Sequence, residues 1–236
     1  LFDKHKRYLE KDYFSYRKNL TDHPLVNIYA EFLWEKLKEK YPQLKRENSN
    51  FNYEVTIDVD HPWAYLYRGF DTYLSLLKPL FLFRFGEFGL RIKSIKKQID
   101  PYDSFDKITR YCSPDNTIFF FLINGKSKFD GKYKFNHKKY RKLIYDLHCK
   151  GYTTGIHTSY ESFLSKEITR AEIRSLEDII KSKILCSRQH YLRYRLPETY
   201  NNLLDSGILD DYTTCPVNYI GFRNCIATPF PWYNLK

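Results

Sequence analysis

The feature that most constrains this fold is a repeated exchange of strand-like and helix-like segments after residue 50. Short β-rich stretches alternate with stretches whose apolar residues recur at helical spacing. The expected helices are 136–150, 165–181 and 198–206, and the expected strands are 51–58, 117–123, 152–157, 184–190, 208–213 and 221–227. Strands separated by helices in this way form a mostly parallel sheet, either open or closed into a barrel. The sequence therefore predicts an α/β protein.

Residues that favour helix ends support these helices. Asn136 is the expected N-cap of the first, and Gly151 lies just past its end. Ser165 opens the second helix in the same way. Gly207 follows the third, where a glycine readily adopts the left-handed backbone that ends a helix.

The N-terminal part of the chain has a different pattern. Residues 25–41 have apolar side chains at helical spacing, and the polar stretch 43–50 follows them. We expect a boundary there, with 1–50 as a short helical N-terminal appendage and 51–236 as the α/β domain. The pattern of 68–100 favours neither helix nor strand.

Composition argues against several classes of protein. No apolar run is long enough to span a bilayer, so no transmembrane helix is expected. The five cysteines form an odd set without a Cys-x-x-Cys pair, which argues against a disulfide framework and favours a reducing, cytoplasmic compartment. A net charge of +11 would suit a polyanion, but the lysines are spread along the chain without a basic arm. Nucleic acid is therefore not an expected partner.

Polar residues follow the first expected strand at the point where it ends. The stretch "TIDVDHP" closes that strand with Asp58 and Asp60, followed by His61. Residues at i and i+2 of a strand point the same way, about 7 Å apart at Cα. Ligands of parallel α/β folds bind where the carboxyl ends of the strands converge. Both carboxylates are thus expected to face the ligand site.

Other polar residues are expected at the same rim. His157 ends the third strand, Arg188 and His190 share one side of the fourth, and Asp211 ends the fifth. Carboxylates and imidazoles from different strands suit a divalent metal with an open position for water. Such a metal lowers the pKa of the water toward ~7 and polarises a substrate carbonyl. A spare carboxylate beside it can accept the proton of the water.

Each of these residues also has an ordinary structural interpretation. An Asp at a strand end, such as Asp58, often caps the next turn. His157 can be a hydrogen-bonded rim residue, and Arg188 and Arg193 can be surface salt-bridge partners. His61 precedes a proline, which favours an extended backbone, and we interpret it as a positioning residue.

The order of these motifs resembles the polysaccharide deacetylases of carbohydrate esterase family four. The segments "TIDVDHPWAY", "GIHTSYES", "SRQHYLRYRLPETY" and "GFRNCIATPFPWY" look like a bacterial, polysaccharide-deacetylase-like branch that often has an extra N-terminal domain. The resemblance covers residues 51 to about 235. It implies a distorted (β/α) barrel of mostly parallel strands, with residues 1–50 as the end of the extra domain. It also implies metal-dependent removal of acetyl groups from a polysaccharide or amino sugar.

By position, the resemblance implies that Asp58 is the catalytic base and that Asp60 and His157 are metal ligands. The family has a second histidine four residues after the first, and this chain has Glu161 there. The third ligand is therefore either Glu161 or His190 from the next strand.

The resemblance extends less closely to three further residues. Arg188 or Arg193 matches the arginine of the family, and Asp211 loosely matches the acidic residue that orients the base or the catalytic histidine. The implied cofactor is a divalent metal, with zinc the first choice. The final Leu-x-Leu-His motif of the family, which supplies the general acid, is absent.

Two other functions remain open at this point. A glycoside hydrolase could use Asp58 with a second carboxylate such as Asp211, provided that the two lie ~5–9.5 Å apart. A non-catalytic carbohydrate-binding protein with a decayed site is favoured by Glu161 and by the missing final histidine.

Overall fold

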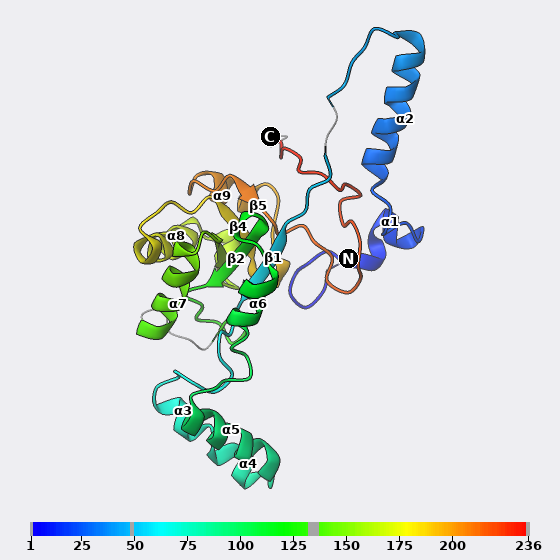
Figure 1. Ribbon diagram of the computed structural model, residues 1–236. Helices are drawn as coiled ribbons and strands as arrows, with labels where there is room; N and C mark the ends of the chain where they lie inside the picture. The colour runs from blue at the N-terminus through cyan, green and yellow to red at the C-terminus, as the bar shows by residue number, and fades with distance from the viewer. Residues whose placement is uncertain (1, 48–49, 132–136, 235–236) are drawn as a thin grey trace.

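A five-stranded, all-parallel sheet forms the centre of the protein (Figure 1). The computed structural model describes residues 2–47, 50–131 and 137–234. Each strand pairs with the next one along the chain, in the order β1-β2-β3-β4-β5. The strands are β1 (Val55–Val59), β2 (Thr117–Leu122), β3 (Thr153–Thr158), β4 (Cys186–Gln189) and β5 (Asp210–Asp211). The expected α/β class is confirmed.

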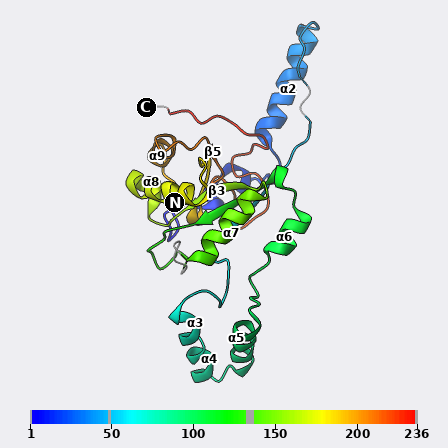
Figure 2. The same ribbon diagram turned by 60° about the vertical axis from the view of Figure 1, so that its left-hand side comes forward.

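Helices connect the strands and extend the molecule in two directions (Figures 1 and 2). Those that connect β1 to β5 include α6 (Phe105–Tyr111), α7 (Lys138–Cys149), α8 (Lys166–Ile180) and α9 (Glu198–Leu204). At the N-terminus are α1 (Phe14–Arg17) and α2 (Leu25–Lys40), and after β1 come α3 (Phe70–Leu74), α4 (Leu77–Phe81) and α5 (Phe85–Lys97). Short 3₁₀ turns are η1 (Glu10–Asp12), η2 (Pro114–Asn116), η3 (Ser162–Leu164) and η4 (His190–Leu192). Within the described ranges, no helix has both the length and the apolarity needed to cross a bilayer.

The main core lies between the helices and the outer face of the sheet. Phe119 and Phe121 of β2 point into it and are fully buried. They pack with Ile144 of α7 and Leu176 of α8, among other apolar residues. All six residues of β2 are buried, because both faces of this strand are covered, which explains its continuous apolar sequence.

A smaller apolar cluster around one aromatic ring lies on the inner face of the sheet, the face opposite the main core. Phe120 of β2 packs there with Ile118, Cys186 and Tyr212. A Cβ on Gly155 of β3 would lie 2.4 Å from Cε1 of Phe120 and 2.9 Å from Sγ of Cys186. Such distances are shorter than any tolerable contact, so only glycine fits opposite this ring.

The sheet curls but does not close, so the distorted barrel that the resemblance implies is not confirmed. In a flat sheet, four spacings would separate β1 from β5 by about 19 Å. Yet the Tyr212 hydroxyl, just after β5, donates to Glu54 Oε2, just before β1, at 2.7 Å. The two edges therefore approach each other through side chains, and among the described residues no backbone ladder joins them.

Several expected elements differ from the structure. No strand forms over 221–227, because its backbone groups pair with the N-terminal segment: Phe222 N donates to Thr21 O and Val26 N to Cys225 O. The first strand begins only at Val55, and β5 is two residues long.

Other expectations are confirmed. The helix expected at 25–41 is α2, although none of its described side chains is buried. Ser165 caps α8, accepting from Ile168 N at 3.3 Å, and Gly207 has a φ of 89° after α9. Asn136, the expected N-cap of the first helix, lies outside the described residues, and the His137 ring caps α7 by accepting from Lys139 N.

Candidate metal centre

Three potential ligands converge at the carboxyl ends of β1, β3 and β4. They are Asp60, His157 and His190, and their ligand atoms lie within 4.8 Å of one another. Asp60 Oδ1 is 3.3 Å from His157 Nε2 and 3.5 Å from His190 Nδ1. The two ring nitrogens are 3.0 Å apart. Asp58 pairs with Phe120, which lies on the inner face of the sheet, and His157 pairs with Arg188. Because side chains alternate along a strand, Asp60 faces the same side as Asp58, and His190 the same side as Arg188. All three candidate ligands therefore lie on the inner face.

The hydrogen bonds of the two imidazoles fix which nitrogens carry protons. His157 Nδ1 contacts the Arg188 carbonyl at 2.8 Å, and His190 Nε2 contacts the Phe129 carbonyl at 2.9 Å. Carbonyl oxygens only accept, so these outer nitrogens must be the N–H donors. In the neutral rings, His157 Nε2 and His190 Nδ1 then carry no proton, and their lone pairs face each other.

The electrostatics of this group favour a cation. Burial is the largest cause that lowers the pKa of His157 from its usual 6.5, so this ring is neutral near pH 7. Asp60 Oδ1 is buried and accepts no hydrogen bond from the described residues. One proton shared between the imidazoles would satisfy their two lone pairs but leave Asp60 Oδ1 without a partner, whereas a divalent cation satisfies all three acceptors. The Asp60, His157 and His190 group can therefore hold a metal ion.

Asp58 lies beside this group and is oriented by an arginine. Arg188 NH1 donates to Asp58 Oδ1 at 2.9 Å, and NH2 donates to Thr56 Oγ1 at 2.9 Å. The guanidinium lies over the Phe120 ring, 4.9 Å from its centroid, and Nε donates to the Tyr212 carbonyl at 3.0 Å. Because every side of the guanidinium is engaged, Arg188 gives Asp58 a defined orientation.

A cavity of about 380 Å³ opens onto these groups. Asp58, Asp60, His157 and His190 all line it, together with His61. Asp58 and Asp60, which were expected to face the same side of the first strand, thus line the same cavity.

The remaining predicted site residues lie elsewhere. Glu161 is exposed, at the turn before η3, and is not one of the three converging ligands. Arg193 is buried under the N-terminal segment, where Nε donates to the His5 carbonyl and the guanidinium lies 3.7 Å from the Tyr160 ring centroid. The structure therefore favours His190 over Glu161 as the third ligand, and Arg188 over Arg193 beside Asp58.

Asp211 does not face the cavity. Its carboxylate accepts from Ser187 Oγ at 2.9 Å and from Thr213 Oγ1 at 2.8 Å. Ser187 precedes Arg188 on β4, so its side chain points to the opposite face of the sheet. Burial is the largest cause that raises the pKa of Asp211. This carboxyl group links β4 to the segment after β5.

The N-terminal segment completes the rim of the cavity, and no sequence pattern predicts this position for it. Arg7 lines the cavity, and its NH1 donates to the Tyr191 carbonyl at 3.1 Å. Asp3 holds the same guanidinium through Nε at 2.7 Å. Tyr191 and Leu192 follow the candidate ligand His190 directly, and both have positive φ values, 58° and 54°, that cost energy in residues with a Cβ. Arg7 is thus positioned to hold the turn that orients His190.

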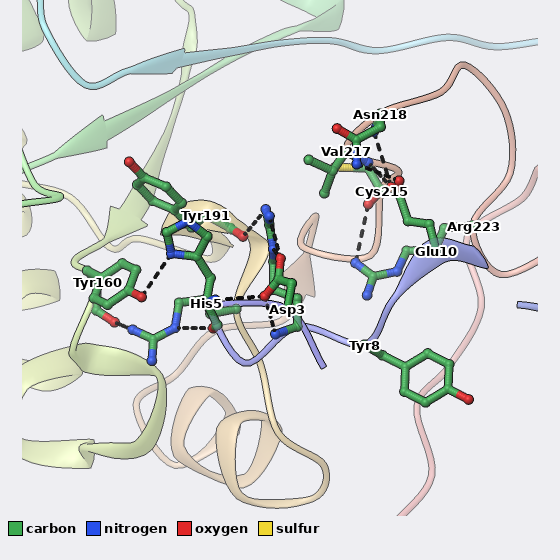
Figure 3. Close-up of polar contacts among 12 residues, drawn as sticks. Asp3, His5, Tyr8, Glu10, Tyr160, Tyr191, Cys215, Val217, Asn218 and Arg223 are labelled. Carbon is green, nitrogen blue, oxygen red and sulfur yellow. Dashed lines mark hydrogen bonds and ion pairs between the residues drawn. The ribbon is translucent and has the colours of Figure 1, made fainter. Parts of the chain in front are cut away.

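Further contacts attach this segment to the loops around the site (Figure 3). His5 points toward Tyr160 and Tyr191, and its Nδ1 lies 3.0 Å from the Tyr160 hydroxyl. Glu10 reaches the C-terminal loop, where it accepts from Val217 N at 2.6 Å. Segments far apart in the sequence therefore meet at the cavity.

A second unexpected residue fixes the loop that follows Asp60. The buried carboxylate of Asp100 accepts from the backbone N–H groups of Ala64, Tyr65 and Leu66, at 2.7, 2.8 and 3.0 Å. Nothing local in the sequence relates Asp100 to that loop, because more than thirty residues separate them.

Comparison with known proteins identifies one family model. Residues 2–42 match a model described as "Family of unknown function (DUF7033)". No curated protein and no solved structure matches the chain. The matched segment includes Arg7, which lines the cavity, and α2, whereas the candidate metal ligands lie outside it.

Proposed function

We propose that this protein is a metal-dependent hydrolase that removes acetyl groups from a polysaccharide or amino sugar. The observation that supports this proposal is the combination of three converging ligands with a separate, oriented carboxylate in one cavity. A metal ion alone would need only Asp60, His157 and His190. Asp58 is available for proton transfer because it belongs to the cavity and not to the ligand group.

Zinc is the metal that the donor set suits best. Two imidazole nitrogens and one carboxylate oxygen, with a fourth position facing the cavity, are a common catalytic zinc set. In tetrahedral zinc sites the ligand atoms lie about 3.3 Å apart, given bonds of about 2.0–2.1 Å. The three ligand atoms here are separated by 3.0, 3.3 and 3.5 Å.

The chain's own residues account for the proton transfers of deacetylation. A bound divalent metal supplies an activated water and polarises the acetyl carbonyl. Asp58 accepts the proton of the attacking water, and Arg188 keeps its carboxylate directed at the cavity. Among the described residues, His61 is the imidazole that lines the cavity besides the two ligands, and we assign it the donation of a proton to the leaving group. The products are acetate and the free amine or hydroxyl of the sugar.

The glycoside hydrolase alternative has less support. It requires a second carboxylate across the sugar from Asp58. Asp211 was the expected partner, but it hydrogen-bonds to Ser187 and Thr213 on the other side of the sheet. Asp60 belongs to the ligand group.

Acetate release by the zinc-loaded protein tests the proposal. The substrates are N-acetylglucosamine oligomers and O-acetylated oligosaccharides. Asp58→Asn should lower kcat by roughly 10²–10⁴-fold, because it removes a general base, while zinc affinity stays close to that of the wild type. His61→Ala should lower kcat with the same unchanged zinc affinity.

Two results would contradict the proposed deacetylase activity. Zinc-loaded wild-type protein that binds these sugars without releasing acetate would support the non-catalytic carbohydrate-binding alternative. Asp58→Asn with full activity would exclude Asp58 as the base. Tyr102→Ala, a change of an exposed residue outside the cavity, serves as the control and should leave acetate release unchanged.

A further inference from the structure

The three helices α3, α4 and α5 form a helical arm, residues 70–97, that extends from the sheet. In both views the arm lies at the opposite end of the molecule from α2 (Figures 1 and 2). Of its described side chains, only Thr72, Pro79 and Ser94 are buried, and none of these is a large apolar residue. The arm therefore contributes little to the hydrophobic core.

Large apolar side chains instead face solvent at the turn between α4 and α5. Phe81 is 75% exposed, Phe83 79% and Phe85 62%, and Leu82 between them is 51% exposed. Single exposed apolar residues are common, but four within five positions form a contiguous patch that a soluble surface rarely leaves bare. The turn between α4 and α5, to which these four residues belong, lies at the end of the arm away from the sheet (Figure 2).

The arm is also strongly basic. From Phe70 to Lys97 it has two acidic residues, Asp71 and Glu87, and six basic ones: Lys78, Arg84, Arg91, Lys93, Lys96 and Lys97. Glu87 is paired with Arg91 and lies 3.8 Å from Arg84. The four lysines are exposed and form no ion pair with a described acidic residue.

The base of the arm contacts the loop that follows Asp60. Arg91 donates to the Ser75 carbonyl, and its guanidinium lies 5.0 Å from the Tyr65 ring centroid. Asp100, just after the arm, binds the backbone of the loop that follows Asp60. The base of the arm is thus connected to the loop that follows Asp60.

We propose that the arm is a docking surface for a membrane with anionic lipids. Phe81, Leu82, Phe83 and Phe85 enter the interfacial region, and the exposed lysines contact the negatively charged headgroups. Aromatic and aliphatic residues flanked by lysines are typical of segments that lie on a bilayer without crossing it. This inference does not depend on the proposed hydrolase activity.

The composition of the arm favours lipid over a protein partner. Lysine is depleted at the buried centre of protein–protein interfaces, whereas a polar, anionic bilayer surface attracts it. Four lysines within twenty residues would be costly to bury against another protein, but near headgroups they keep their water and gain electrostatic attraction.

Co-sedimentation of the full chain with vesicles tests this proposal. The vesicles are phosphatidylcholine alone or phosphatidylcholine mixed with phosphatidylglycerol. We expect binding only to the mixed vesicles, weakening as salt is added. Phe83→Ser/Phe85→Ser should reduce the partition coefficient by at least about tenfold, since it removes two inserted rings. Lys96→Gln/Lys97→Gln should reduce it by about fivefold for each lysine.

A matched control removes equally exposed apolar groups elsewhere. Phe51 is 90% exposed and Ile220 97%, and neither belongs to the arm. Phe51→Ser/Ile220→Ser should bind vesicles as the wild type does. All these side chains are exposed, so the variants should keep the wild-type circular dichroism spectrum.

Three outcomes would overturn the proposal. The first is equal binding to both kinds of vesicle, or to neither. The second is Phe83→Ser/Phe85→Ser binding that matches the control. The third is a concentration-dependent dimer in sedimentation velocity that Phe83→Ser/Phe85→Ser abolishes, which would make the patch a contact between two copies of this chain.

Discussion

Zinc should stabilise the folded protein through Asp60, His157 and His190. The ligand atoms already lie 3.0–3.5 Å apart, so binding requires little rearrangement. With free zinc at about 100 times its Kd, the stabilisation RT ln(1 + [L]/Kd) is about 2.7 kcal/mol. A chain of this size shifts its Tm by roughly 2–4 °C per kcal/mol, so the Tm should rise by about 5–11 °C.

Differential scanning calorimetry with and without zinc measures this shift. Asp60→Asn and His190→Ala should each lose most of it, because two remaining ligands bind zinc far more weakly than three. Each variant is compared with its own zinc-free Tm, since His190→Ala also removes a hydrogen bond to the Phe129 carbonyl. His23→Ala is the matched control, because His23 is exposed and its ring pairs with Asp22. It should shift as the wild type does.

The reasoning is refuted if zinc raises the Tm of Asp60→Asn as much as that of the wild type. Zinc would then be bound elsewhere, for example by the free thiols of the five cysteines. An anomalous-scattering map at the zinc edge gives an independent check, with a peak expected between Asp60 and the two imidazoles.

Three further predictions concern residues around the site and in the core. Arg7→Met should weaken zinc binding by about 10–100-fold, measured against a competing chelator, because Arg7 holds the turn after His190. Gly155→Ala should lower the free energy of unfolding in urea by about 1–3 kcal/mol through overlap with Phe120, and Gly155→Ala/Phe120→Leu should recover part of the loss. Burial raises the pKa of Glu172 from 4.5 to about 7, so folding favours the protonated carboxyl group. The free energy of unfolding is therefore highest below pH 4.5 and falls as the pH rises to about 7, by about 3 kcal/mol in all. Glu172→Gln should remove this decline from the stability–pH profile, and an unchanged profile would assign the decline to other groups.

Features of the fold that depend on local patterns were predictable from the sequence. Ser165 was recognised as a helix cap because its side chain acts within three residues. Asp58 and Asp60 were expected in one space because side chains alternate along a strand, and both line the cavity. By contrast, 221–227 has the composition of a strand, but no neighbouring strand pairs with it.

The choice of the third ligand could not be made from sequence spacing. Two side chains four residues apart face the same side in a helix, and Glu161 would need that geometry to join His157. β3 ends at Thr158 and a turn follows it, so Glu161 is exposed and does not join the group, while β4 brings His190 to the site.

The sequence by itself determined the α/β class, the strand-end carboxylates and the histidines beside them, because each follows from periods of a few residues. Only the tertiary structure decided which of these side chains meet, and that Arg7 and Asp100 support the loops around them. The physical reason is that such contacts join residues far apart in the chain, such as Arg7 and Tyr191. They depend on how the sheet curls and on how the N-terminal segment packs, which no local pattern specifies.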